Sequence, residues 1–149
     1  DENNVLYYFA GDGNRATALQ ISDNGKEITQ LWNNKIVDNY MGGIVKQDEF
    51  IYSNGFSKRK FYRLNSTTGA ITDSLAIGRG QTILADSMLY YYNDQGEVHL
   101  VDYKSGLMKD ISSFKITKGS HEHFSHPVIS NGVLYIRHGE YLGAYKIKH

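Results

Sequence analysis

The stretch "HPVISNGVLYIRHGEYLGAYKIK", residues 126–148, alternates short apolar runs with turn signals. The runs "VIS" (128–130) and "VLYI" (133–136) are separated by Asn-Gly, a dipeptide that favours a tight turn between antiparallel strands. The run "GAYKIK" (143–148) follows a second turn at "RHGE" (137–140). No part of the chain sustains the 3.6-residue apolar period of an amphipathic helix. The stretch therefore predicts three short antiparallel strands and almost no helix.

The same pattern recurs along the chain, which has 149 residues. Four apolar positions in the tyrosine-rich strand are aligned as equivalent: Leu6, Phe50, Leu89 and Leu134. Four positions in the following strand recur in step with them: Ile21, Leu64, Val101 and Ile147. A unit of four strands repeated every ~40–45 residues is the sequence signature of a β-propeller blade. A β-sandwich is the alternative, but it gives no reason for two sets of positions to recur together.

The fold class predicted is all-β, a partial β-propeller of about three and a half four-stranded antiparallel blades. Hairpin turns are expected after the third strand of each unit, at Gly25, Gly69 and Gly106. The chain is expected to be one propeller fragment with four units: a partial blade at 1–38, blades at 39–78 and 79–120, and a partial closing blade at 121–149.

Composition excludes several classes of protein. Sixteen basic residues balance sixteen acidic ones, so the chain lacks the excess of basic residues that is typical of proteins that bind nucleic acid. The chain has no cysteine, which removes disulfides and thiolate chemistry. The longest apolar runs fall far short of the ~20 residues that span a bilayer, so no transmembrane segment is expected.

Four of the six histidines lie within residues 121–138, which raises the question of a metal site. On a strand, His121 and His123 would face one side and His126 the other, and Pro127 would interrupt the strand. Three such ligands would not converge on one ion, so no metal site is predicted. The candidates for binding at the propeller face are His121, His123, Arg137 and His138.

No catalytic or cofactor-binding residue is predicted. Paired carboxylates, such as Asp23 with Glu27 and Asp48 with Glu49, fall in turns open to solvent, whereas acid–base catalysis needs a shielded pocket. The glycine-rich "GDG" (11–13) and "GRG" (78–80) precede no helix that could bind phosphate. The recurring tyrosines are better explained by packing between blades than by a carbohydrate-binding platform.

Residues 126–148 resemble the closing blade of pyrroloquinoline-quinone-type β-propeller proteins. That superfamily includes quinoprotein alcohol dehydrogenases and propeller lipoproteins of outer-membrane assembly. The segment "ALQISDNGKEITQLW" (18–32) is similar to the superfamily's repeat, in which an alanine, a glycine turn and a tryptophan dock adjacent blades. The spacing from Gly25 to Trp32 is three residues longer than in the superfamily, and no other tryptophan occurs.

The superfamily's cofactor-stacking tryptophan, calcium ligands and catalytic aspartate have no counterpart in this chain. The resemblance therefore implies a non-catalytic binding or scaffold module, without cofactor, in the periplasm, at the outer membrane or outside a bacterial cell. A fragment of a quinone-dependent dehydrogenase and a carbohydrate-binding propeller remain as alternatives.

The repeats begin and end inside a unit, as in the C-terminal portion of a ring of roughly seven or eight blades. Leu6, Phe50, Leu89 and Leu134 are expected to point between blades. The first and last units then each have one uncovered apolar face, and such a face tends to aggregate or to bind another protein. The sequence therefore predicts that a protein partner or a second copy of the chain covers the open blade edges.

Overall fold

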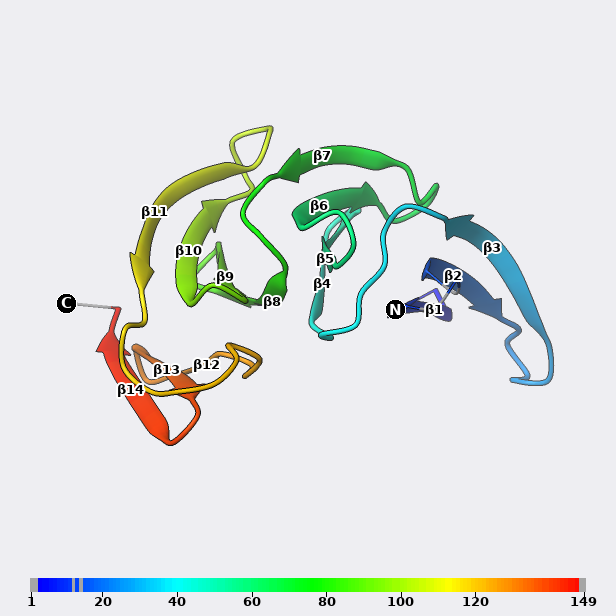
Figure 1. Ribbon diagram of the computed structural model, residues 1–149. Coiled ribbons are helices and arrows are strands. Elements are labelled where there is room, and N and C mark those ends of the chain that lie inside the picture. The colour runs from blue at the N-terminus through cyan, green and yellow to red at the C-terminus, as the bar shows by residue number, and fades with distance from the viewer. Residues whose placement is uncertain (1–2, 12, 14, 148–149) are drawn as a thin grey trace.

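The computed structural model describes residues 3–11, 13 and 15–147. These residues form fourteen strands in four antiparallel sheets, and no helix occurs among them. No helix in this part of the chain could therefore cross a membrane. The sheets stand side by side along an arc (Figure 1). The prediction of an all-β partial propeller is confirmed.

Each sheet is one blade, with its strands in sequence order from the inside of the arc outward (Figure 1). Blade 1 contains β1 (Val5–Ala10), β2 (Arg15–Ile21) and β3 (Ile28–Asn34). Blade 2 contains β4 (Ile44–Gln47), β5 (Phe50–Gly55), β6 (Lys60–Asn65) and β7 (Ile71–Leu75). Blade 3 contains β8 (Gly80–Ala85), β9 (Met88–Asn93), β10 (Glu97–Asp102) and β11 (Lys109–Lys115). Blade 4 contains β12 (Val128–Ser130), β13 (Val133–His138) and β14 (Tyr141–Lys146).

Successive residues of a strand point to opposite faces of its sheet, so each blade contacts both neighbours. In β9, Leu89 and Tyr91 pack toward blade 2 with Phe61, whereas Tyr90 and Tyr92 pack toward blade 4. Of the recurring tyrosines, Tyr8 on blade 1 is 37% exposed, whereas Tyr52, Tyr90, Tyr91 and Tyr92 are buried. Their burial supports the interpretation that the tyrosines pack blades together.

Trp32 docks blade 1 onto blade 2. Its indole nitrogen donates a hydrogen bond of 2.9 Å to the carbonyl oxygen of Ser66. Gly69, in the β6–β7 turn, has a φ of 69°, and a Cβ there would lie 2.4 Å from the Trp32 ring. Glycine therefore serves both the turn and the close approach of the two blades. This is the role that the resemblance implied for a tryptophan at this place.

The strand registers correct the predicted equivalence of Phe50 with Leu89. The β4–β5 turn pairs Gln47 with Phe50, and the β8–β9 turn pairs Ala85 with Met88. Phe50 therefore corresponds to Met88, and it is Ile51 that corresponds to Leu89. The one-residue error arises because the sequence alignment matched Tyr52 of β5 to Tyr91, the second of three adjacent tyrosines in β9, instead of to Tyr90. Since the side-chain period is two, Phe50 points to the opposite neighbour, toward blade 3.

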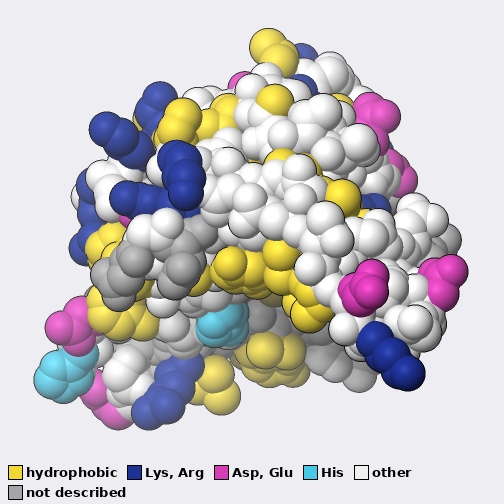
Figure 2. Space-filling model, turned by 90° about the vertical axis from the view of Figure 1, so that its right-hand side faces the viewer, with side chains coloured by type: hydrophobic (Ala, Val, Ile, Leu, Met, Phe, Trp, Pro, Cys, Tyr) yellow, Lys and Arg dark blue, Asp and Glu magenta, His cyan; other side chains and the backbone are white. Residues whose placement is uncertain are grey.

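The two end blades each expose an apolar face. Leu89 and Leu134 are fully buried against the preceding blade, whereas Leu6 is 47% exposed because no blade precedes β1 in the described residues. At the other end, Leu142 is 65% exposed on the face of blade 4 that points away from blade 3. A view from the side of β1–β3 shows hydrophobic side chains gathered in a band across the middle (Figure 2). Leu6 therefore lies on the face of blade 1 that the sequence predicted to be uncovered, and no neighbouring blade covers it among the described residues.

Candidate binding face

One end of the propeller carries the connections between blades. Because the strands alternate in direction, the crossovers β3–β4 (35–43), β7–β8 (76–79) and β11–β12 (116–127) emerge at the same end. The hairpin turns β5–β6, β9–β10 and β13–β14 lie at this end too. We call this end the crossover face. Loops positioned by a rigid scaffold are the usual sites of binding, which makes the crossover face the candidate binding face.

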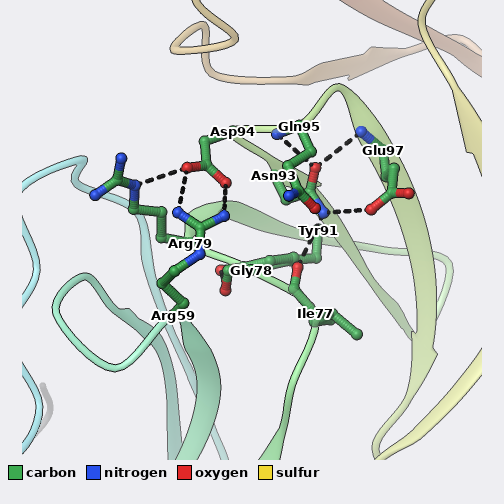
Figure 3. Close-up of polar contacts among 9 residues, drawn as sticks. All are labelled: Arg59, Ile77, Gly78, Arg79, Tyr91, Asn93, Asp94, Gln95 and Glu97. Atoms are coloured by element: carbon green, nitrogen blue, oxygen red, sulfur yellow. Dashed lines mark hydrogen bonds and ion pairs between the residues drawn. The ribbon is translucent and has the colours of Figure 1, made fainter.

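A carboxylate clamp ties blade 2 to blade 3 on the crossover face (Figure 3). Arg59 donates to both oxygens of Asp94, at 2.8 and 2.9 Å, and the Nε of Arg79 donates to the same carboxylate at 2.7 Å. Burial alone would raise the pKa of Asp94, but the hydrogen bonds from both arginines outweigh it and hold that pKa below its ordinary value. The carboxylate is thus held ionised by two cations, which suits a structural link and not a general base.

Asn93, the neighbour of Asp94, fixes the β7–β8 crossover (Figure 3). Its amide nitrogen donates to the carbonyl oxygen of Ile77 at 3.0 Å and to Glu97 at 2.9 Å. Its amide oxygen accepts from the backbone nitrogens of Gln95 and Glu97 at 3.0 and 2.9 Å. A single buried amide therefore holds both the turn and the crossover in place.

Asp38 makes a similar link between blades 1 and 2. Arg15 lies 2.9 Å from its carboxylate, and the backbone nitrogen and hydroxyl of Ser57 donate to it. Burial opposes ionisation of Asp38, but the bonds from Ser57 and the charge of Arg15 lower its pKa overall. Both buried carboxylates of the crossover face are therefore engaged in holding blades together.

The histidines of the crossover face form a stacked pair. The rings of His123 and His138 lie 3.6 Å apart with 21° between their planes, and the Tyr92 hydroxyl lies 2.5 Å from Nδ1 of His123. Burial, followed by the charge of His138, lowers the pKa of His123. The two nitrogens of His138 lie 2.8 and 2.7 Å from the carbonyl oxygens of Lys118 and His121. The pair thereby holds the β11–β12 crossover against blade 4.

The side chains of the other two predicted face residues, His121 and Arg137, are not part of the stacked pair. The side chain of His121 is exposed, as is that of Arg137, whose Nε donates to the carbonyl oxygen of Gly139 at 2.8 Å. No strand passes through 116–127, so the strand geometry expected for His121, His123 and His126 does not apply. In the described part of the chain, no three histidine or acidic side chains gather as a metal site would require.

An aromatic pocket, which the sequence did not predict, opens on the same face. Its volume is about 350 Å³, and its walls are Tyr40 and Met41 from the β3–β4 crossover, Phe56 from the β5–β6 turn, and Phe124 from the β11–β12 crossover. The rings of Tyr40 and Phe56 are 4.8 Å apart. Tyr40 and Phe124 are about half exposed, at 50% and 53%. Exposed aromatic side chains gathered around a hollow are typical of an interaction site.

Gln81, at the start of β8, completes the pocket with a buried polar group. Its side chain is fully buried, and its amide nitrogen donates to the carbonyl oxygen of Phe124 at 3.2 Å. Its amide oxygen has no hydrogen-bond partner among the described residues. An unsatisfied buried acceptor is unusual in a folded protein and calls for a physical explanation.

Comparison with known proteins supports the fold. No family model matches the sequence, and no curated protein matches it. The crystal structure of BamB from Moraxella catarrhalis is similar over 99% of this chain, with a TM-score of 0.69 and 15% sequence identity. The chain spans 44% of that protein's length. A likeness at this level of identity establishes a β-propeller fold.

Proposed function

We propose that this chain is a non-catalytic protein-binding module of the bacterial cell envelope, built on a pyrroloquinoline-quinone-type propeller. In this proposal residues 1–149 form one propeller fragment, with blade limits at 38, 78 and 120. The envelope location, periplasmic, outer-membrane-associated or extracellular, rests on the resemblance of residues 126–148. The aromatic pocket carries the proposal of protein binding, because large aromatic side chains around a desolvated centre are the usual anchors of protein interfaces.

The chemistry of the crossover face supports binding over catalysis. Asp94 and Asp38 are each held by partners on neighbouring segments, which leaves neither carboxylate poised as a general base. Tyr91 and Tyr92, two of the tyrosines that could have formed a carbohydrate platform, are fully buried. We also propose that His121, His123, Arg137 and His138, which belong to the same end of the propeller, contribute to contacts with the partner.

The test is selection of peptides from a random phage-displayed library on the purified chain. We expect selected peptides to bind the chain and to lose most of their affinity for the Phe124→Ala variant, which removes one wall of the pocket. The matched control is Leu107→Ala, which removes a side chain that is 62% exposed on the opposite end of the propeller. Peptides that bind Phe124→Ala as tightly as the unmodified chain would contradict the proposal.

The alternative functions are tested in the same preparation. A quinone-dependent dehydrogenase would change its absorbance spectrum when pyrroloquinoline quinone and calcium are added. A carbohydrate-binding propeller would give signals on a glycan array. We expect neither response, and a saturable response in either assay would replace protein binding as the proposed function.

We expect the open blade faces to bind a second copy of the chain in solution. Leu6 and Tyr8 occupy the face of blade 1 that, in blades 2 to 4, receives a preceding blade, and Leu142 occupies the face of blade 4 that would receive a following one. The open face of blade 1 in one copy can therefore pack against the open face of blade 4 in another. Two copies arranged head to tail in this way cover all four of their open faces. Equilibrium sedimentation should show a dimer, with Leu142→Glu as a monomer.

The control for this association is Leu107→Glu, which places the same charge on an exposed leucine remote from either face. It should dimerise as the unmodified chain does. A well-folded monomer across the accessible concentration range, or a Leu142→Glu variant that still dimerises, would contradict head-to-tail pairing of the open faces.

A further inference from the structure

We propose that the aromatic pocket and Arg79 together bind an acidic segment of the partner, in which an apolar side chain enters the pocket and a neighbouring carboxylate pairs with the terminal amino groups of Arg79. This inference rests on the proposed function as a protein-binding module. It adds the chemistry of the segment that the module recognises.

The first observation is that Arg79 is held in place while part of its guanidinium remains unused. Its Nε donates to Asp94 at 2.7 Å, and its guanidinium lies 4.0 Å from the centre of the Phe56 ring. Its two terminal nitrogens have no hydrogen-bond or ion-pair partner among the described residues, and they point away from Asp94 (Figure 3). These nitrogens are not buried, and the side chain is 28% exposed, so a partner can reach them.

The second observation is the place of this guanidinium beside the pocket. Phe56 is both the ring that Arg79 covers and a wall of the pocket, together with Tyr40 at 4.8 Å. A carboxylate accepts two parallel hydrogen bonds from a guanidinium, and Arg79 loses little conformational freedom on binding because Asp94 and Phe56 already restrict it. An extended chain rises ~3.3 Å per residue, so the carboxylate should lie one or two residues from the apolar side chain in the pocket.

The third observation is a surplus of positive charge on this side of the pocket. Arg59 and Arg79 bring two positive charges to the single carboxylate of Asp94. Lys58 is exposed in the same turn as Phe56 and adds another positive charge. An acidic segment is therefore attracted to this side of the pocket, whereas a basic segment is repelled.

The charges on the other sides of the pocket offset each other. On the β3–β4 crossover, Arg15 lies 2.9 Å from the carboxylate of Asp38. Beyond Phe124, Arg137 and Glu122 line a second hollow and carry opposite charges. The residues that line the aromatic pocket itself are all uncharged. The surplus beside Phe56 is therefore what selects the charge of the partner.

The experiment uses acetylated and amidated peptides that combine phenylalanine with one variable residue: glutamate, glutamine or lysine. The variable residue either follows phenylalanine directly or is separated from it by one glycine. Each peptide is titrated into the 149-residue chain at low salt while backbone amide and arginine Nε–H signals are followed by NMR. At the better spacing, we expect the glutamate peptide to bind about threefold to tenfold more tightly than the glutamine peptide, and the lysine peptide to bind most weakly.

Two further results should locate the effect. The largest shifts should fall in residues 40–41, 56, 79 and 124, and the advantage of glutamate should shrink as salt approaches ~1 M, where the Debye length is ~3 Å. Arg79→Gln should bind the glutamate and glutamine peptides equally. The control Lys104→Gln removes an exposed cation from the β10–β11 turn, at the opposite end of the propeller, and should keep the difference.

Equal binding of the glutamate and glutamine peptides to the unmodified chain at both spacings would overturn the inference, as would the absence of binding by every peptide. This comparison needs no variant that must fold. A preference for glutamate that persists in Arg79→Gln would also overturn it, because the carboxylate would then bind elsewhere.

The failure of this inference can be distinguished from the failure of the proposed function. If library-selected peptides need Phe124 but bind Arg79→Gln unchanged, the pocket binds protein and the acidic chemistry of the partner is wrong. If selected peptides bind Phe124→Ala unchanged, the proposed function itself is contradicted at this site.

Discussion

Phe61→Ala should lower the free energy of unfolding by about 3–5 kcal/mol, the usual cost of truncating a buried phenylalanine. Phe61 is fully buried in the core between blades 2 and 3, with its ring 4.5 Å from that of Tyr91. The loss is a large fraction of a typical total stability of ~5–15 kcal/mol. Urea unfolding followed by circular dichroism measures it.

Trp32 offers a second readout of the same experiment. It is the only tryptophan, and it lies between blades 1 and 2, one interface away from Phe61. If the blades unfold cooperatively, fluorescence of Trp32 and circular dichroism will report the same shift in midpoint. The control Leu107→Ala removes an exposed side chain and should change stability by less than ~0.5 kcal/mol. A loss below ~1 kcal/mol for Phe61→Ala would contradict the packing of blade 2 on blade 3.

The architecture could be predicted because blades repeat. Strands such as β5 and β9 must present apolar residues to two neighbouring blades, and each is followed by a hairpin, so the same signals recur at a fixed interval. The register of β5 was predicted one residue out. Residue type alone could not decide between Phe50 and Ile51, since both are apolar and face different blades.

The aromatic pocket could not be predicted by the same reasoning. Tyr40, Phe56 and Phe124 lie in connections that have no repeated sequence, and only the packing of the blades side by side brings them together. Gln81 appeared in the sequence as the first polar residue of an inner strand. That its oxygen lacks a donor depends on the position of the Phe124 carbonyl, 43 residues away. The course of residues 121–126 depends on tertiary contacts in the same way, because His138 holds this segment as a crossover by contacting the carbonyl oxygen of His121.

Asp94→Asn should lower the free energy of unfolding by about 2 kcal/mol at neutral pH. The carboxylate accepts three charged hydrogen bonds, and hydrogen bonds to charged groups contribute ~1.5–3 kcal/mol each. The expected loss of stability is smaller than the sum of these contributions, because the side chains of Arg59 and Arg79 are 41% and 28% exposed and water screens both ion pairs. Urea unfolding of the two chains at neutral pH measures the difference. The control is Asp23→Asn, an exposed turn carboxylate, which should change stability little.

The dependence on pH has a definite sign. The folded chain holds the pKa of Asp94 below its ordinary value, so the unfolded chain binds the proton more readily. The contribution of Asp94 is therefore fully present above the ordinary carboxyl pKa of ~4 and declines as the pH falls through the lower, folded value. The stability difference between the unmodified chain and Asp94→Asn should shrink over that acidic range and stay constant from about pH 6 to 8. A difference that grows as the pH falls below 4 would show that the arginine clamp does not hold Asp94 ionised.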